Sequence, residues 1–162
     1  MLDSLIFVND DSAKTPLDSD ELEVEVKAHA VNQKDVVIAM GRLSSSTPMI
    51  GELSGIVTSV GCNAQTSFKV GDRVCGFGGS SYQTRSRINH NLVQRIPDSM
   101  TFAQGASFPY AFQTAYHALV EIANLQHDGS VLIHSALSSV GMAAILGKLT
   151  CPLGFTEKIQ ET

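Results

Sequence analysis

The sequence predicts a mixed α/β fold in which a β-rich region precedes several helices and the start of a nucleotide-binding fold. Short apolar runs punctuated by glycine recur up to residue 96, which is typical of a small barrel or sandwich. After residue 98 the apolar residues take helical spacing instead. Residues 131–141 (VLIHSALSSVG) then predict a buried strand, a tight turn of small residues and a helix, the order that opens a dinucleotide-binding fold.

Several short segments of the β-rich region are predicted to form strands. Residues 21–27 (ELEVEVK) alternate strictly between aliphatic and charged side chains, which is the period-two pattern of a strand with one solvated face. The other runs are bounded by glycine or by polar links that contain proline. They are residues 2–8, 53–60, 73–77 and 92–96.

Helical signals accompany and follow these strands. Residues 32–40 favour a short helix with Asn32 as its N-cap and Asp35 three residues later. Thr101 begins a T-x-x-Q capping box, whose reciprocal bonds satisfy two N–H groups of a helix start. Residues 114–125 repeat apolar side chains at helical spacing and predict a longer helix.

The composition excludes several classes of partner. With 162 residues, 43% of them hydrophobic and 17% charged, the chain is long enough for a domain with a core. A net charge of −5 argues against binding to nucleic acid or to an anionic membrane, because phosphates would be repelled. No apolar run approaches a membrane span, and no basic stretch marks a secretory signal. We therefore expect a cytoplasmic protein with no nucleic-acid and no membrane partner.

The cysteines and histidines predict no metal site. Cys62, Cys75 and Cys151 are odd in number, which favours free thiols over disulfides in a chain without a signal peptide. Their spacing matches no zinc pattern, and the five histidines are scattered along the chain.

Six short motifs follow one another in a single collinear order over roughly residues 1–148. They are N-x-x-D (Asn32, Asp35), E-x-x-G (Glu52, Gly55), FKVGDRV (68–74), IPD (96–98), TAY (114–116) and VLIH (131–134). In this order the motifs resemble the medium-chain dehydrogenase/reductase superfamily. They are most similar to the enoyl reductase domains of highly reducing fungal polyketide synthases. Six motifs in the same order are specific evidence for this superfamily, although each motif alone is weak evidence.

This resemblance implies a GroES-like β-rich partial barrel over residues 1–108, which forms the substrate-side domain. Residues 109–150 would begin a Rossmann-type NADPH-binding domain, incomplete after its first strand and helices, and residues 151–162 would form an irregular tail. Domains of this kind use NADPH to reduce an α,β-enoyl thioester on an acyl carrier protein, passing hydride to the β-carbon. The implied partners are the acyl thioester and its carrier, with either a second copy of the chain or a larger synthase.

The same resemblance implies cofactor-binding residues but assigns no catalytic residue. Asn32 and Asp35 match positions that line the nicotinamide pocket, although both residue types also favour helix caps. Thr114 matches a position that helps to hold the nicotinamide amide, and it is also a good N-cap for its helix. The turn before the last helix supplies the remaining residues, which are Ser138, Ser139, Val140 and Gly141.

Zinc-dependent relatives carry a cysteine and a histidine at two metal-ligand positions, and this chain has neither. Asn32 and Gly51 stand there instead, so the resemblance implies a zinc-independent reductase. Glu52 is expected to hold a turn or to pair with an arginine, with substrate contact as the alternative. His134 lies inside the predicted apolar strand, and we expect it to be a buried core histidine.

Two features of the C-terminal region predict weakened function. Related reductases place two adjacent glycines where this chain has serines, and a β-carbon at a position that requires positive φ costs about 1 kcal/mol or more. Only residues 142–162 follow the turn, whereas each further βαβ unit needs about 30 residues. We therefore expect weaker cofactor affinity than in the related reductases.

The sequence thus favours a fragment of an NADPH-dependent enoyl reductase that is inactive as the isolated chain. Two other interpretations stay open. One is a quinone-reductase-like oxidoreductase that is completed in trans by another chain, and the other is a non-catalytic GroES-like binding module. Turnover by the isolated chain would contradict the first interpretation.

Overall fold

The computed structural model describes residues 8–9, 15–43, 48–78, 81–126 and 130–150. All but the last residue of the strand expected at 2–8 lie outside these ranges, as does the tail expected at 151–162. The chain folds into two compact units, Met1–Pro109 and Tyr110–Thr162, and each is described by itself below.

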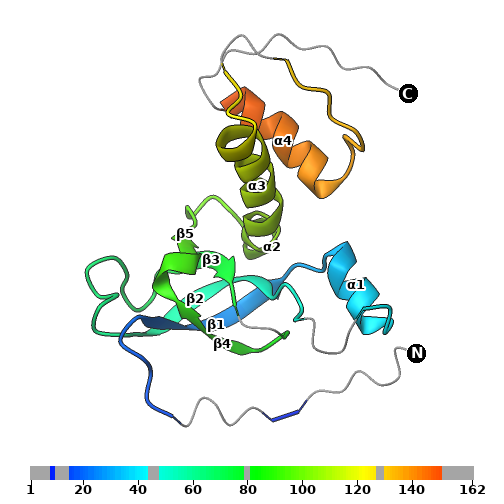
Figure 1. Ribbon diagram of the computed structural model, residues 1–162. Helices are drawn as coiled ribbons and strands as arrows, with labels where there is room; N and C mark the ends of the chain where they lie inside the picture. Colours follow the sequence, from blue (N-terminus) through cyan, green and yellow to red (C-terminus); the bar gives the residue numbers. More distant parts are fainter. Residues whose placement is uncertain (1–7, 10–14, 44–47, 79–80, 127–129, 151–162) are drawn as a thin grey trace. The chain divides into compact units, whose positions relative to one another are not determined.

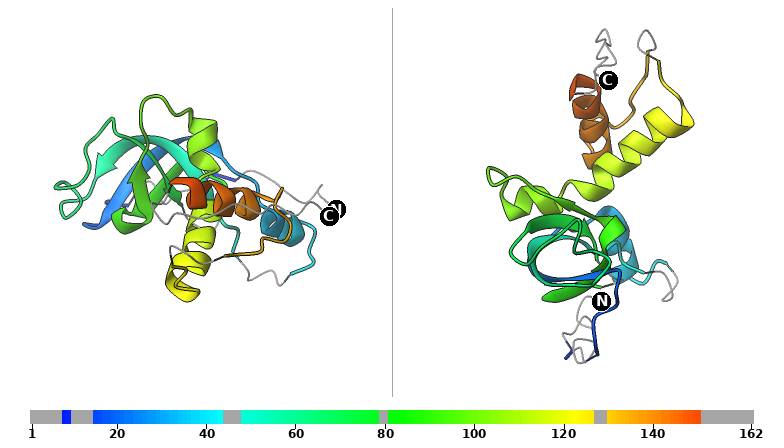
Figure 2. Two further views of the ribbon diagram at one scale, coloured as in Figure 1. Left: turned by 90° about the horizontal axis from the view of Figure 1, so that it is seen from above. Right: turned by 90° about the vertical axis from the view of Figure 1, so that its left-hand side faces the viewer.

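The first unit is built on a five-stranded antiparallel sheet with the strand order β4-β1-β2-β3-β5. Its strands are β1 (Glu21–His29), β2 (Glu52–Val60), β3 (Arg73–Phe77), β4 (Arg85–Asn89) and β5 (Val93–Arg95). The register shifts twice along β1, and such bulges bend a strand and increase its twist. The sheet accordingly curls into a half-barrel (Figure 1; Figure 2, right-hand view).

The core of this unit follows from the alternation along the strands. Leu22 and Val24 of β1 are buried, and their charged neighbours face outward, as the pattern of residues 21–27 predicts. Leu53 and Val57 of β2 extend the same apolar layer. Burying a side chain of this kind stabilises the fold by about 1.5–3 kcal/mol relative to leaving it exposed.

Two short helices belong to the same unit. Helix α1 (Gln33–Ala39) follows β1, with Asn32 as its N-cap. Helix α2 (Phe102–Ala106) begins with the predicted capping box, in which Thr101 Oγ1 accepts from the Gln104 N–H at 3.2 Å and Gln104 Oε1 accepts from the Thr101 N–H at 2.9 Å. Helix α2 packs against β1, β2 and β3, so it covers one face of the sheet. Both predicted helix starts are confirmed.

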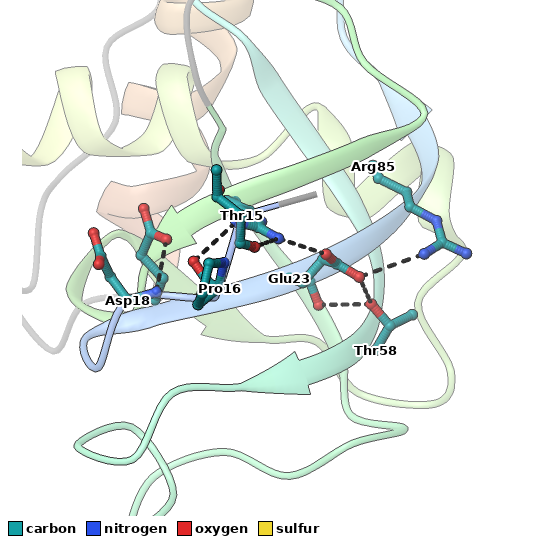
Figure 3. Close-up of polar contacts among 8 residues, drawn as sticks. Thr15, Pro16, Asp18, Glu23, Thr58 and Arg85 are labelled. Atoms are coloured by element: carbon teal, nitrogen blue, oxygen red, sulfur yellow. Dashed lines mark hydrogen bonds and ion pairs between the residues drawn. The ribbon is translucent and has the colours of Figure 1, made fainter. Parts of the chain in front are cut away.

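The outer face of the sheet carries a polar cluster centred on Glu23 (Figure 3). Its carboxylate accepts a hydrogen bond from Thr58 Oγ1 at 3.0 Å and pairs with Arg85 at 3.5 Å. Arg87 pairs with the same carboxylate at 3.6 Å and donates to Thr15 Oγ1 and to the Thr15 carbonyl. These contacts tie the chain before β1 to the edge strand β4.

The second unit consists of α3 (Pro109–Tyr116), the π-helical turn η4 (His117–Ile122) and α4 (Ser139–Thr150). The buried centre of its core is made of alanine side chains, and larger, partly buried side chains such as Phe112 and Leu119 pack against it. The buried members of this core are Ala111, Ala115, Ala143 and Ala144. No helix among the described residues is both long and apolar enough to cross a membrane.

Three predictions about the second unit and β5 need correction. Residues 131–133 form no strand, because no described strand lies beside them to complete a ladder. The helix expected at 114–125 begins earlier, at Pro109, and continues as a π-helical turn that ends at Ile122, whose side chain is 71% exposed. The strand expected at 92–96 is shortened to Val93–Arg95, because a 3₁₀ turn precedes it.

Candidate functional site

The N-terminus of α1 is fixed by a buried carboxylate. Asp35 is 2% exposed, and its Oδ2 accepts the backbone N–H of Asn32 at 3.0 Å. Its Oδ1 accepts the N–H of Ile50 at 2.7 Å, which ties the helix to the segment that leads into β2. The capping interpretation of Asn32 and Asp35 is confirmed, while their contact with a cofactor stays a prediction.

Glu52 lies beside this cap and is also buried. It is the first residue of β2, it is 1% exposed, and its Oε2 accepts the side-chain Nδ2–H of Asn32 at 2.9 Å. The residue before it, Gly51, has φ 63°, a left-handed conformation in which a side chain costs about 1–2 kcal/mol.

A histidine and a tyrosine that the sequence motifs do not include complete this polar cluster. The rings of His29 and Tyr82 meet edge to face, with centroids 4.9 Å apart. His29 Nδ1 lies 3.1 Å from the Glu52 carbonyl oxygen, and its Nε2 lies 2.9 Å from the Gln83 carbonyl oxygen and 3.1 Å from the Gln83 backbone nitrogen. Tyr82 donates to the Ala30 carbonyl at 3.2 Å. The loop that carries Tyr82 is thereby attached to the end of β1.

Burial and nearby negative charge raise the pKa of two weak acids, Tyr82 of this cluster and Cys75 of β3. Burial, followed by the charges of Asp35 and Glu52, raises the pKa of Tyr82 to about 12. Burial, followed by the charge of Glu52, raises the pKa of Cys75 to about 11. Near neutral pH both groups are uncharged, so Tyr82 acts as a hydrogen-bond donor and Cys75 is not a nucleophilic thiolate.

In the second unit, the predicted nucleotide turn leads into α4. Ser135 has φ 57°, a left-handed conformation of the kind that glycine adopts without cost, and the Ser138 N–H donates to its carbonyl at 2.9 Å. Ser138 caps the helix, because its Oγ accepts the Gly141 N–H at 3.1 Å and its carbonyl accepts the Met142 N–H at 2.8 Å. Ser139 and Val140 occupy the first turn of α4.

Gly141 is required by close contact with this turn. A β-carbon at this position would lie 2.9 Å from the Cα of Ala136 and closer still to the carbonyl oxygen of Ser135. The absence of a side chain therefore lets the helix pack directly on the turn, which is one of the roles of glycine in dinucleotide-binding turns. The start of α4 fits a pyrophosphate in this respect, whereas the Ser138 hydroxyl already uses the Gly141 N–H.

Two residues of the second unit differ from expectation. Thr114 is not an N-cap, because α3 begins five residues before it; its Oγ1 donates to the Tyr110 carbonyl at 2.6 Å. His134 is exposed rather than buried, because the strand that would have buried it does not form. The side chains of Asn32, Asp35 and Glu52 thus converge in the first unit, while Thr114 and the 138–141 turn lie in the second.

Among the residues that the structure describes, no group of three or more His, Cys, Asp or Glu side chains could hold a metal ion. The cluster around Asn32 combines two carboxylates, an amide, an imidazole and a phenol. Such a set can orient an amide or a carbonyl group of a ligand through hydrogen bonds.

Comparison with known proteins gives a consistent assignment. Residues 18–122 match the family described as alcohol dehydrogenase GroES-like domain. Over 146 residues the chain is 47% identical to the highly reducing polyketide synthase curS1 of Aspergillus terreus; the match covers 90% of this chain and 6% of the synthase.

Solved structures extend the similarity to both units. The CurK enoyl reductase matches with a TM-score of 0.81 and 28% identity, over 94% of this chain and 49% of that protein. The Escherichia coli quinone oxidoreductase complexed with NADPH matches with a TM-score of 0.68 and 27% identity, over 85% of this chain and 44% of that one. The chain therefore spans about half the length of these structures and a small fraction of the synthase.

Proposed function

The chain belongs to the GroES-like family of the medium-chain dehydrogenase/reductase superfamily, and from this premise we propose that it forms the substrate-side part of an NADPH-dependent enoyl reductase. The observation that carries the proposal is the 47% identity to a highly reducing polyketide synthase, together with the similarity to an enoyl reductase structure. The proposed substrate is an α,β-enoyl thioester on an acyl carrier protein. The proposed setting is association with a larger synthase.

Two features support an NADPH site. The similar quinone oxidoreductase is described as complexed with NADPH, and the turn at Ser135–Ser138 packs on Gly141 as a dinucleotide-binding turn requires. In this proposal the first turn of α4, with Ser138, Ser139, Val140 and Gly141, holds the pyrophosphate. Thr114 helps to hold the nicotinamide amide. Because the Ser138 hydroxyl competes for the Gly141 N–H, binding is weaker than at a glycine-rich turn.

The residues of the first unit are assigned to orientation rather than to proton transfer. When bound, NADPH would supply a hydride to the β-carbon, and a proton added at the α-carbon would complete the saturation of the enoyl double bond. Asn32 and Asp35 line the nicotinamide pocket in this proposal. Asp35 also holds the backbone of Asn32 and of Ile50, so that this surface is rigid. Tyr82 stays protonated and secures the adjoining loop to Ala30.

A second candidate function is the reduction of quinones, which the similarity to the E. coli quinone oxidoreductase favours. In that case another chain completes the site. A third interpretation, a non-catalytic GroES-like binding module, predicts that the chain supports no NADPH oxidation in any context.

The proposal is tested by placing this chain in a full-length enoyl reductase, in exchange for the corresponding region. NADPH consumption is then measured with crotonyl thioester and, separately, with a quinone. We expect thioester-dependent consumption by the hybrid protein and none by the isolated 162-residue chain. Quinone-dependent consumption alone would favour the second function, and a folded hybrid that is inactive with both acceptors would favour the binding module.

A further inference from the structure

The buried carboxylate of Glu52 contacts the side chain of Asn32, which the proposed function sets against the nicotinamide. Glu52 Oε2 lies 2.9 Å from Asn32 Nδ2. Glu52 is 1% exposed, whereas Asn32 is partly exposed, so a ligand would meet the amide and not the carboxylate. A carboxylate buried at this depth is costly unless hydrogen bonds satisfy it, so its presence here requires a reason.

The chemistry of the pair determines which way the amide points. An ionised carboxylate only accepts hydrogen bonds, and a carboxamide has a donor end and an acceptor end that differ by a half-turn of its terminal torsion. If Asn32 turned over, its Oδ1 would face Glu52 Oε2, and both oxygens would repel each other without a proton between them. The nitrogen end is therefore fixed toward Glu52.

The backbone that carries the amide is fixed independently. The Asn32 N–H donates to Asp35 Oδ2 at 3.0 Å, and Asp35 also holds the N–H of Ile50, two residues before Glu52. Asp35 and Glu52 thus hold Asn32 from two sides, one through its main chain and the other through its side chain.

We propose that Glu52 is a positioning residue, whose carboxylate fixes the orientation of the Asn32 carboxamide and thereby the hydrogen bonds that Asn32 offers to a ligand. One Nδ2–H is taken by Glu52, and this bond sets the direction of the second Nδ2–H. This inference rests on the proposed function for the identity of the ligand, but the orientation itself is a property of the chain.

Two matched variants of Glu52 show whether its carboxylate orients the Asn32 carboxamide or whether the side chain only fills space. Glu52→Gln has the same size and keeps an oxygen that accepts the Asn32 Nδ2–H, whereas Glu52→Met has a similar length and accepts nothing. The direct readout is the pair of Asn32 side-chain amide protons in NMR spectra. We expect one of them to be shifted and protected from exchange in the native chain and in E52Q, and to lose both properties in E52M. Unchanged amide protons in E52M would overturn the proposal.

The functional readout is titration of the ¹⁵N-labelled chain with NADPH at millimolar concentration, followed by backbone chemical shifts. We expect E52M to weaken binding about three- to tenfold, the value of one hydrogen bond, and as much as Asn32→Ala does. E52Q should keep most of the affinity, and E52M should add nothing to N32A. Additive losses in the double variant would overturn positioning.

Failure of the proposed function would look different. If NADPH changes no backbone amide chemical shift of the native chain, the cofactor assignment is wrong. The side-chain amide protons of Asn32 still show whether Glu52 fixes the orientation of the carboxamide. If E52M does not fold, the pairing can be tested with the double variant that combines Asn32→Asp and E52Q. In that variant the amide at position 52 can donate a hydrogen bond to the carboxylate at position 32. We expect Asn32→Asp alone to lower the thermal stability and the combination to recover it; no recovery would contradict the pairing.

Discussion

The hydroxyl oxygen of Ser138 accepts a hydrogen bond from the backbone N–H of Gly141 at 3.1 Å, and the two residues together form the start of α4. This contact has two consequences. It satisfies one N–H group of the helix terminus, which stabilises the helix, and it removes that group from the set that could bind a phosphate.

Replacing the capping serine is predicted to destabilise α4. Ser138→Ala should lower the free energy of unfolding by about 1 kcal/mol, the usual value of an N-cap hydroxyl. Urea unfolding followed by helical circular dichroism measures the change. Ser139→Ala is the matched control, because Ser139 is the adjacent exposed serine in the first turn of the helix. Equal losses in the two variants would show that the hydroxyl of Ser138 does not cap the helix.

Two glycines of α4 are predicted to respond oppositely to alanine. Gly141→Ala should destabilise the second unit, because the new β-carbon would lie 2.9 Å from the Cα of Ala136. Gly147→Ala meets no atom within 4 Å and should stabilise the helix by up to about 1 kcal/mol through its higher helix propensity. Thermal unfolding of both variants provides the comparison. A stable G141A variant would mean that the turn does not pack on the helix.

The stability of the fold is predicted to fall at alkaline pH. The pKa of Cys75 is raised from 9.0 to about 11 and that of Tyr82 from 10.0 to about 12. The folded state therefore holds these protons more tightly than the unfolded state does. Their contribution to stability is complete below about pH 9 and is lost as the pH rises through about 11 to 12. Urea unfolding at about pH 8 and near pH 10.5 should show a smaller loss in Cys75→Ala and Tyr82→Phe than in the native chain. An unchanged pH dependence in both variants would contradict these assignments.

Thiol reactivity should distinguish the two cysteines that the structure describes. Cys62 is exposed, while Cys75 is buried and has a raised pKa. Iodoacetamide at about pH 8 should therefore alkylate Cys62 and leave Cys75 intact until the chain is unfolded in urea. Peptide mapping by mass spectrometry gives the result. Equal labelling of both thiols in the folded protein would show that β3 is not buried as described.

The polar cluster at Glu23 predicts a difference between two arginines of β4. Arg87 has 16% of its side chain exposed and donates to Thr15 as well as pairing with Glu23. Arg87→Lys should lower the free energy of unfolding by about 1–2 kcal/mol, because an ammonium group cannot donate the several hydrogen bonds that the planar guanidinium makes here. Arg85→Lys, with 62% exposure and a single ion pair, should cost less than about 0.5 kcal/mol. Equal effects in chemical unfolding would argue against the contact with Thr15.

The sequence predicts those strands and helices whose own residues show a regular apolar alternation or a capping motif. Alternation in residues 21–27 identifies β1, and the T-x-x-Q box identifies the start of α2. Strand β4 is missed because its inward side chains, Ser86 and Ile88, give too weak an alternation among arginines and asparagine. The predicted strand at 131–133 fails for another reason, since a buried strand depends on neighbours that its own residues do not specify.

Some residues of the candidate site can likewise be predicted from the sequence, and others cannot. Asn32 and Asp35 can be predicted because the N-x-x-D spacing is also the spacing of a helix cap. His29 and Tyr82 cannot, because they meet only through the pairing of β1 with β2 and through a loop more than fifty residues away in the sequence. The side-chain bond from Asn32 to Glu52 likewise joins two motifs that the sequence shows as separate.

Following the transferred hydride shows whether this chain is the substrate-side part of an enoyl reductase. The hybrid reductase that contains this chain is supplied with NADPH deuterated at the transferable position and with crotonyl thioester, and the product is analysed by mass spectrometry and NMR. We expect saturated thioester with deuterium at the β-carbon. Oxidation of the cofactor without labelled saturated thioester, by a hybrid shown to be folded, would contradict this expectation.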